Sequence, residues 1–320
     1  MQRTSIGRKA ALYTKLAAVL AVGAWAAFTP LVSVAPGMGA PQGKSARASV
    51  PQAPGKAPQL SFSGAQKQAS ARADSSRALD TAVAMPSGFS GLGLFSGGKK
   101  VGMLIAMDTA SGARVDFLAR KLHEADFTFK KLEETYSLGG RKIAMVVSAA
   151  FTSDWEGING YAAENGTDVG SSWDVKSGTV VIRDGMPEII GGDAQGGRQA
   201  FRSVLEGGAS MFQQYLVLHN GCARKNINIS TKPRFFVEYA LAGKTFFGVA
   251  NFDSTMRVSE AAGILKAMGV KNAVYLDGGA VSQGYYYNYS GGKMAPRIIG
   301  CHDWDEMPPI YTNVLVFYSK

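Results

Sequence analysis

Apolar residues in the last two thirds of the chain recur mainly in short runs with the length of strands. Each run is bounded by glycine, proline or polar residues, which is typical of buried strands. Four such runs stand alone: 101–107, 142–149, 215–219 and 310–318. A domain rich in sheet is therefore expected.

Two further pairs of apolar runs are each joined by a short turn sequence. Asp184-Gly185 separates one pair and Gly243 lies in the turn of the other. Both turns favour the positive φ angles that tight hairpins require. The predicted hairpins are 179–183 with 186–190 and 235–241 with 245–251.

Helical spacing of apolar residues occurs in three segments: 115–122, 200–205 and 259–268. The last is the clearest, because its apolar residues share one face and Gly269 supplies a stop. Glycines precede the second segment at positions 191, 192, 196 and 197. Their spacing is not that of a dinucleotide-binding loop, so we interpret them as loop residues.

The strand 245–251, the helix 259–268 and the run 270–277 follow one another closely. Strand, helix and strand of this length are typical of a crossover between parallel strands. We therefore predict a single mixed α/β (α+β) domain with a partly parallel sheet, hairpins and packed helices. Asn251 and Asp277 would then end neighbouring strands at one edge, where such sheets bind ligands.

The first 40 residues predict export. Residues 1–15 carry basic but no acidic side chains, and 16–28 is almost wholly apolar. This is the pattern of a secretory signal. Thr29 and Pro30 interrupt the apolar run, which is marginal for a spanning helix of about 20 residues. A cleaved signal is the first interpretation and an uncleaved N-terminal anchor the second, so we expect a periplasmic or membrane-anchored protein.

Residues 41–90 predict a disordered tether, because few large apolar side chains offset the entropy of ordering. Residues 1–100 hold 12 of the 34 basic residues and 2 of the 24 acidic ones, so the net charge of +10 lies in the first 100 residues, mostly in the leader and tether. The domain at 91–320 is balanced in charge, which argues against nucleic acid as a partner. The basic tether either contacts an anionic envelope surface or is only a soluble linker.

The chain has two cysteines, Cys222 and Cys301. In an oxidising compartment, two cysteines in one domain suggest a disulfide. His219 and His302 would complete the ligand set of a structural zinc site, but an adjacent cysteine and histidine do not easily reach one tetrahedral ion. Two unpaired buried thiols are the third alternative.

Asp277 is the main candidate for a functional group. An apolar run delivers it onto Gly278 and Gly279, which permit positive φ angles and close approach of a ligand to the backbone. Ser282 and the tyrosines 285–287 follow, and these rings either stack on sugars or simply pack. From these residues alone, a ligand site and a simple Asp-Gly turn are equally well supported.

Residues 142–318 resemble the phosphodiester glycosidase family. The resemblance rests on short motifs in family order: Ser148-Ala-Ala-Phe151, Lys232-Pro-Arg234, Val249-Ala-Asn251, Tyr275-Leu-Asp-Gly-Gly279 and the closing Thr312-Asn-Val-Leu-Val316. The segment 166–170, the hairpin around Asp184-Gly185 and the helix beginning near Met256 also fit the family. It implies a hydrolase for glycosyl phosphodiesters, with Asp277 as the catalytic carboxylate and Arg234 as a phosphate contact. Further substrate contacts would come from Asn251, Ser148, His219, Gly278, Gly279 and Ser282.

The residue types suit this chemistry. A sugar 1-phosphodiester has a weakly basic leaving group, so the reaction needs a carboxylate more than a general acid. Asp277 would attack the anomeric carbon or activate water, and would stabilise the developing positive charge. Arg234 could hold a phosphate through two parallel hydrogen bonds, unless it is only a surface charge after a proline turn. Asn251 either binds sugar hydroxyls or caps its strand, and His219 has an ordinary structural role as its alternative.

Several positions depart from the family pattern. Ser148 stands where the family usually has Asn, Asn251 where it has Asp, and Phe235 where Thr is common. These changes favour, as the alternative, a non-catalytic carbohydrate-binding or polysaccharide-assembly module on the same fold. The leading prediction is an exported hydrolase of a sugar–phosphate linkage in an envelope or extracellular glycan. No cofactor is expected, although the run 302–306 offers oxygen ligands for a divalent cation such as calcium.

Overall fold

A computed structural model describes most of the chain from residue 84 onward. The described residues are 84–123, 127–153, 157–171, 176–192, 194–224, 227, 229–241, 243–278, 283–290, 293–299, 310 and 312–320. The predicted leader at 1–40 and nearly all of the predicted tether at 41–90 lie outside them. Within the described part, no helix is long and apolar enough to span a membrane.

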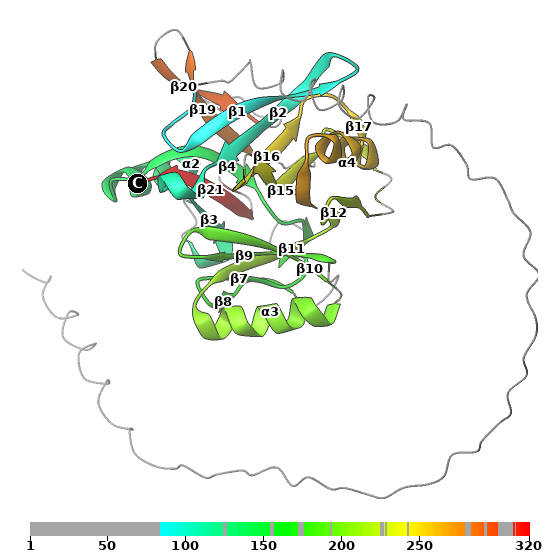
Figure 1. Ribbon diagram of the computed structural model, residues 1–320. Coiled ribbons are helices and arrows are strands. Elements are labelled where there is room, and N and C mark those ends of the chain that lie inside the picture. The colour runs from blue at the N-terminus through cyan, green and yellow to red at the C-terminus, as the bar shows by residue number, and fades with distance from the viewer. Residues whose placement is uncertain are drawn as a thin grey trace, which may run out of the picture. The chain divides into compact units, whose positions relative to one another are not determined.

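Three sheets form the framework of the described chain (Figure 1). In strand order, the first sheet contains β1 (Phe89–Ser96), β2 (Lys99–Met107), β16 (Lys244–Phe252), β15 (Arg234–Leu241), β18 (Val270–Tyr275), β12 (Leu216–His219) and β13 (Cys222–Ala223). The second contains β20 (Lys293–Ile298), β19 (Gly284–Ser290), β4 (Lys142–Ser148), β21 (Asn313–Ser319) and β3 (Arg114–Ala119). The third contains β10 (Met186–Gly191), β9 (Gly178–Arg183), β11 (Ser210–Gln214), β7 (Ala162–Glu164) and β8 (Thr167–Asp168).

The remaining elements are short strand pairs and helices. The strand pairs are β5 (Thr152–Ser153) with β6 (Gly157–Ile158), and β14 (Ser230–Thr231) with β17 (Met256–Arg257). The helices are α2 (Phe129–Leu138), α3 (Ala194–Gly207) and α4 (Val258–Ala267), with 3-10 turns η2 (Thr109–Ser111) and η3 (Arg120–Leu122).

One central apolar core joins the three sheets. Ile105 and Phe236 of the first sheet, Phe117 of the second and Phe212 of the third belong to it, and the rings of Phe117 and Phe212 stack with centroids 5.2 Å apart. Each sheet buries its other face under one helix: α4 on the first, α2 on the second and α3 on the third. Figure 1 shows α3 running along the outer face of the third sheet. Because both faces of each sheet are covered, its strands carry apolar residues on both sides. This explains the short apolar runs in the sequence.

The predicted partly parallel, mixed α/β sheet is wrong. Every ladder between the named strands is antiparallel. Within the described chain, the parallel contact found is an isolated bridge between Ile158 and Gly170. β16 and β18 do run in the same direction, but β15 lies between them and pairs with both. The connection through α4 therefore passes over β15, which lies between β16 and β18. The lengths of the strands and the helix do not reveal that a strand lies between them.

Two local predictions are also corrected. The segment 115–122 was expected to be a helix, but β3 occupies 114–119 and only the turn η3 follows. Its buried residues alternate with half-buried ones, and β21 pairs along its whole length, so the strand period prevails. Gly196 and Gly197, expected in a loop, lie inside α3. There, a side chain at Gly197 would meet the Gln213 amide at 2.2 Å, so glycine permits the close packing of α3 on the third sheet.

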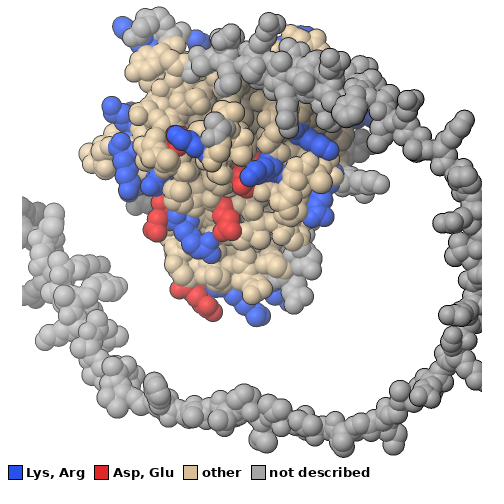
Figure 2. All heavy atoms as spheres, viewed as in Figure 1, with Lys and Arg blue, Asp and Glu red and all other residues tan. Residues whose placement is uncertain are grey.

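Both predicted hairpins are confirmed. β9 and β10 join through Asp184 (φ 52°) and Gly185 (φ 74°), and β15 and β16 pair from Arg234 to Leu241. The sequence did not predict β1, α2, β11 or the β19–β20 hairpin. β1 begins at Phe89, within the segment expected to be tether. On the face shown in Figure 2, basic and acidic side chains lie interspersed, as expected for a domain with balanced charge.

Candidate active site

Three of the predicted site residues meet at one edge of the first sheet. Arg234 begins β15 and pairs in register with Asn251 near the end of β16, while Asp277 follows β18. The Arg234 Nε donates to Asn251 Oδ1 (3.1 Å), and its Nη1 donates to the Asp277 carbonyl oxygen (3.4 Å). Arg234, Asn251 and Asp277 meet even though the predicted parallel pairing of the strands that end near Asn251 and Asp277 is wrong. Because β15 is antiparallel to both neighbours, its first residue lies between their last ones.

Both ionisable groups of this trio are withdrawn from water. Arg234 is 3% exposed and Asp277 is 7% exposed. Burying charges is costly and is tolerated when they are paired or hydrogen-bonded, as buried functional groups commonly are. Asp277 is thus buried beside Arg234, whereas Asp184 of the β9–β10 Asp-Gly turn is exposed.

Tyr275 extends the site. Burial raises the pKa of its phenol, and the Asp277 carboxylate raises it further. A hydrogen bond with Thr231 and the charge of Arg234 act in the opposite direction. The phenol is thus close enough to feel both charges and stays protonated at neutral pH. Tyr275 was recognised in a motif but not as a site residue, because its place in a buried strand suggested packing.

A basic group of side chains flanks the trio on the side of β16 and β2. Asn251 Nδ2 donates to Asp253 Oδ1 (3.1 Å). Local desolvation raises the pKa of Asp253, whereas the charges of Lys100 and Lys232 and the Asn251 hydrogen bond lower it. Sequence reasoning missed Lys100 and Asp253. Neither belongs to a motif, and the pairing of β2 with β16 brings Lys100 to this edge from far away in the chain.

Ser148 hydrogen-bonds the backbone near the site through its hydroxyl. Its Oγ accepts from Gln283 N (2.9 Å) and donates to Gln283 O (3.2 Å). In the same turn, the Ala149 carbonyl accepts from Asp277 N (2.9 Å). Ser148 therefore fixes the backbone at Gln283, a few residues after Asp277 in the chain. Its expected role as a substrate contact stays a prediction.

The glycines after Asp277 are only partly described. Gly278 does not adopt the positive φ angle that the sequence suggested. Its smallness matters instead, because a side chain there would approach the Lys232 carbonyl oxygen to 3.2 Å. Gly279 and Ser282 lie outside the described residues, so their contacts with substrate stay predictions.

Asn313, at the start of β21, holds the turn that carries Ala149. Its Oδ1 accepts from Ala150 N (2.7 Å) and its Nδ2 donates to Ala150 O (3.1 Å), with Asn313 only 2% exposed. The Asn313 side chain thus makes the two hydrogen bonds to Ala150 that the backbone of a neighbouring strand would otherwise make. The sequence placed Asn313 in a family motif but gave no sign of this contact.

Replacing Asn313 with Ala should weaken the fold. Two backbone groups of Ala150 would lose their partners in a buried place, and an unsatisfied buried group costs about 1–3 kcal/mol. We expect a loss of that size in the free energy of unfolding, measured by urea denaturation. Gln199→Ala on the exposed side of α3 is the control and should change it by less than about 0.5 kcal/mol. Equal stabilities of the two variants would contradict the assigned role of Asn313.

His219 is not brought to this edge. It ends β12, which is antiparallel to β18, so it lies beside the start of β18 while Asp277 follows the end. Its neighbour Asn220 donates from N to Asn272 Oδ1 (2.9 Å). The imidazole packs on the Gly191 backbone, where a side chain would come within 2.6 Å of Nδ1. This placement supports the structural alternative for His219.

The cysteine predictions are only partly covered. Cys222 is exposed on β13, and Cys301 and His302 lie outside the described residues. The disulfide and the zinc site therefore stay predictions. Within the described ranges, no group of three or more histidine, cysteine, aspartate or glutamate side chains could hold a metal ion. The acidic run 302–306 is likewise outside those ranges.

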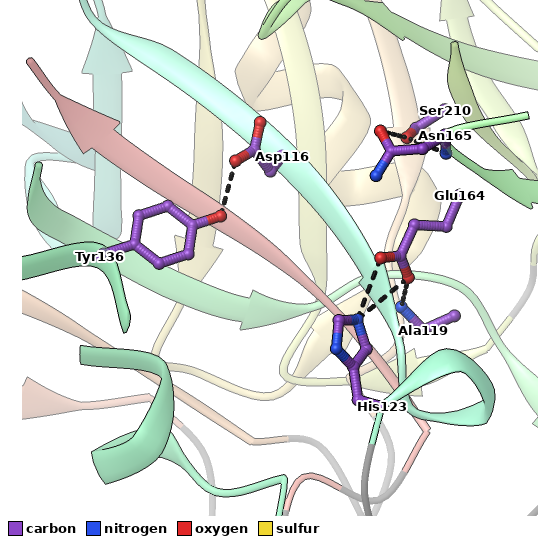
Figure 3. Close-up of polar contacts among 7 residues, drawn as sticks. All are labelled: Asp116, Ala119, His123, Tyr136, Glu164, Asn165 and Ser210. Carbon is purple, nitrogen blue, oxygen red and sulfur yellow. Dashed lines mark hydrogen bonds and ion pairs between the residues drawn. The ribbon is translucent and has the colours of Figure 1, made fainter. Parts of the chain in front are cut away.

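A second polar cluster lies between the second and third sheets (Figure 3). The Glu164 carboxylate, 4% exposed, accepts from Ala119 N (2.6 Å) and contacts His123 Nε2 (3.0 Å). Asp116 accepts from Tyr136 OH (2.6 Å). Since these contacts tie β3 to β7 and to α2, and since none reaches the edge with Asp277, we interpret the cluster as structural.

The Asp116 carboxyl should make stability depend on pH. Burial raises its pKa above the ordinary value of 3.8 and outweighs the Tyr136 hydrogen bond and the Arg141 charge, which lower it. The folded protein therefore holds this proton more tightly than the unfolded chain, and the stabilisation is lost as pH rises from 3.8 through the raised pKa. Denaturation of Asp116→Asn and of wild type is measured across this pH window. As pH rises, the difference in their free energies of unfolding should shift in favour of the variant. Tyr136→Phe is the control, because it removes a hydrogen bond that lowers the pKa of Asp116, so the loss of stability should move to higher pH. A difference in the free energy of unfolding between Asp116→Asn and wild type that does not change with pH would contradict the prediction.

The sequence profile of the phosphodiester glycosidase family matches residues 141–311, more than half of the chain. The protein belongs to this family, and the resemblance found in the sequence is confirmed. A comparison with curated proteins found no match.

The solved structures that match this chain include one enzyme domain and one hypothetical protein. The first is the zebrafish N-acetylglucosamine-1-phosphodiester alpha-N-acetylglucosaminidase catalytic domain, auto-inhibited by its pro-peptide, with 17% identity, a TM-score of 0.47 and coverage of 72% of this chain and 82% of that one. The second, a hypothetical protein from Synechocystis, has 12% identity, a TM-score of 0.40 and coverage of 72% and 62%.

Proposed function

We propose that the protein hydrolyses glycosyl 1-phosphodiesters, with Asp277 acting at the anomeric carbon. The observation that carries this proposal is the buried Asp277 beside the buried Arg234, at an edge that also carries Lys100 and Lys232. A carboxylate next to a basic group matches a substrate whose reacting carbon is bonded to a phosphate. Membership of the phosphodiester glycosidase family supports the same reaction.

Each residue has a part in this reaction. Arg234, Lys100 and Lys232 attract the phosphodiester and stabilise the charge that collects on it as the glycosidic bond breaks. Asp277 stabilises the positive charge that develops at the anomeric carbon. Asn251 holds Arg234 in position through Nε (3.1 Å). Because the phosphate leaves as a weak base, no strong general acid is required.

Asp277 can complete the reaction by either of two routes. As a nucleophile it forms a glycosyl–enzyme ester that water then opens, and the anomeric configuration is retained. As a base it takes a proton from water that attacks directly, and the configuration is inverted. Determining the configuration of the first-formed sugar by proton NMR distinguishes these routes.

Export and an envelope substrate are the finer part of the proposal. The basic start of the chain, the apolar run at 16–28 and the basic segment that follows support delivery to the periplasm or to the outer side of a membrane. A sugar–phosphate linkage of an envelope or extracellular glycan would be the substrate there, with the basic tether near anionic surfaces. Fractionation of cells and N-terminal sequencing of the mature protein test this part, and a cytoplasmic protein with an intact N-terminus would contradict it.

The second candidate is a carbohydrate-binding module that has kept the fold without turnover. The departures from the family pattern favour it, and the Ser148 hydroxyl in particular bonds the backbone of Gln283 in its described hydrogen bonds. Such a protein would bind the glycan through the same edge but release no phosphate monoester.

One assay separates the two candidates. The full-length protein is offered a panel of glycosyl 1-phosphodiesters that differ in the sugar, and release of free sugar and phosphate monoester is followed by mass spectrometry. Turnover of at least one compound supports the hydrolase. Saturable binding without product from any compound would overturn it and support the binding module.

A further inference from the structure

The edge of the first sheet that carries Asp277 has two chemically different halves. In the order β2, β16, β15, β18 and β12, the basic groups Lys100, Lys232 and Arg234 belong to the first half. Asp277 follows β18 and stands at the boundary. Beyond it, towards β12, the site is lined by aromatic rings.

Tyr215 and Phe151 form this aromatic half together with Tyr275. Tyr215, just before β12, accepts from Tyr275 N through its carbonyl (2.8 Å). The Phe151 ring lies 6.0 Å from Tyr215 and 5.3 Å from Tyr275 between centroids. Phe151 follows the turn whose Ala149 carbonyl accepts from Asp277 N. Tyr275 is buried, whereas Phe151 and Tyr215 are half-buried and present part of their surface to solvent.

Two buried polar side chains, Lys176 and Gln214, contact this aromatic half. Lys176 is 3% exposed, and its Nζ lies 4.9 Å from the centroid of the Tyr215 ring. A buried ammonium placed over an aromatic face gains a cation–π attraction. The buried Gln214 amide, with its nitrogen towards Tyr275, donates to Tyr275 O (3.1 Å) and accepts from Phe151 N. Lys176 thus contacts the Tyr215 ring itself, and Gln214 fixes the backbone that carries Phe151.

We propose that Phe151 and Tyr215 form the subsite for the glycosyl group, and that Lys176 positions Tyr215. The inference rests on the proposed function and adds the orientation of the substrate. A pyranose ring presents a face of C–H groups, which packs on aromatic rings whose faces carry partial negative charge. With the sugar on Phe151 and Tyr215 and the phosphodiester on Lys100 and Lys232, the anomeric carbon lies between the two halves, where Asp277 stands.

Binding measurements test the subsite separately from turnover. Full-length Asp277→Asn protein is titrated, by isothermal calorimetry and NMR, with methyl α-glycosides of glucose, galactose, mannose and N-acetylglucosamine, and separately with inorganic phosphate. Adding Tyr215→Ala should weaken the best sugar about tenfold, the loss typical of removing a well-packed aromatic anchor, and leave phosphate affinity unchanged. Adding Lys232→Met should weaken the binding of phosphate and leave the affinity for the sugar unchanged.

Companion variants separate recognition from loss of structure. Tyr215→Phe keeps the ring and should restore sugar affinity to within about threefold of the parent, since only the hydroxyl is missing. Lys176→Met keeps the aliphatic length but removes the cation, and should weaken the sugar and not phosphate. Tyr289→Ala, at a 54% exposed position on β19, is the aromatic control and should change neither. Thermal melting verifies that each variant is folded.

The outcomes bear on the two proposals separately. Sugar binding that depends on Tyr215 supports the subsite even when the wild-type protein releases no product, in which case only the hydrolase proposal fails. Equal weakening of sugar and phosphate by Tyr215→Ala, or sugar affinity unchanged by it, overturns the subsite. Absence of binding by all four glycosides to the folded parent overturns it as well.

Discussion

Replacing Asp277 with Asn is expected to lower the rate of glycosyl phosphodiester hydrolysis by at least about 10³-fold. The change keeps the shape of the side chain and leaves the backbone bond from residue 277 N to Ala149 O intact. It removes the negative charge that faces the developing positive charge at the anomeric carbon. It also removes the nucleophile or base, so kcat falls by either route. Initial rates measured at saturating substrate provide the test.

Asp184→Asn is a closely matched control for this change. Asp184 is also followed by glycine, but it forms the exposed β9–β10 turn at φ 52°, where Asn is equally suited. Its rate should stay within about twofold of wild type, as for an exposed substitution with no stability cost. Undiminished turnover by Asp277→Asn, or equal losses in the two variants, would remove Asp277 from the catalytic role.

The sequence predicted the centre of the site better than its surroundings. Asp277, Arg234 and Asn251 belong to short motifs at strand ends, so their meeting could be expected from local pattern and family resemblance. Lys100 and Tyr215 reach the same edge through pairing of β2 with β16 and of β12 with β18, which no local pattern specifies. For the tyrosines 285–287, the sequence left sugar stacking and packing open. Tyr285 is fully buried against α2, whereas Tyr215 lies at the site.

The fold shows a similar division. Hairpins such as β9–β10 carry their turn signal in Asp184 and Gly185, so sequence alone specified them. The sequence predicts a helix where β3 forms, because Val115, Leu118 and Ala119 also fit helical spacing. Only the pairing with β21 decides between the two periods. The crossover through α4 was recognised, but the strand between its ends comes earlier in the chain. Strand order depends on contacts that are distant in sequence, and its prediction failed for that reason.

Arg234→Lys should reduce kcat/KM for glycosyl phosphodiesters by about 10²- to 10³-fold, comparable to loss of one preorganised donor in an active site. The positive charge remains, so charge alone does not produce the effect. Lysine lacks the planar fork and cannot reproduce both the bond to Asn251 Oδ1 (3.1 Å) and the bond to Asp277 O (3.4 Å). The phosphate would then meet a mobile ammonium in place of a fixed guanidinium, and the chain around Asp277 would lose one of its ties.

A matched substitution isolates this geometric effect. Arg183→Lys changes an arginine that is 50% exposed and paired with Glu188 at 3.5 Å on the third sheet, and it should leave kcat/KM within about twofold. Thermal melting of both variants shows whether loss of the fold contributes. If Arg234→Lys remains folded and keeps wild-type kcat/KM, Arg234 does not bind the phosphate through a fixed fork. The basic half of the edge would then act through charge alone, with Lys100 and Lys232 sufficient for it, and the rate should fall steeply with added salt because exposed charges are screened.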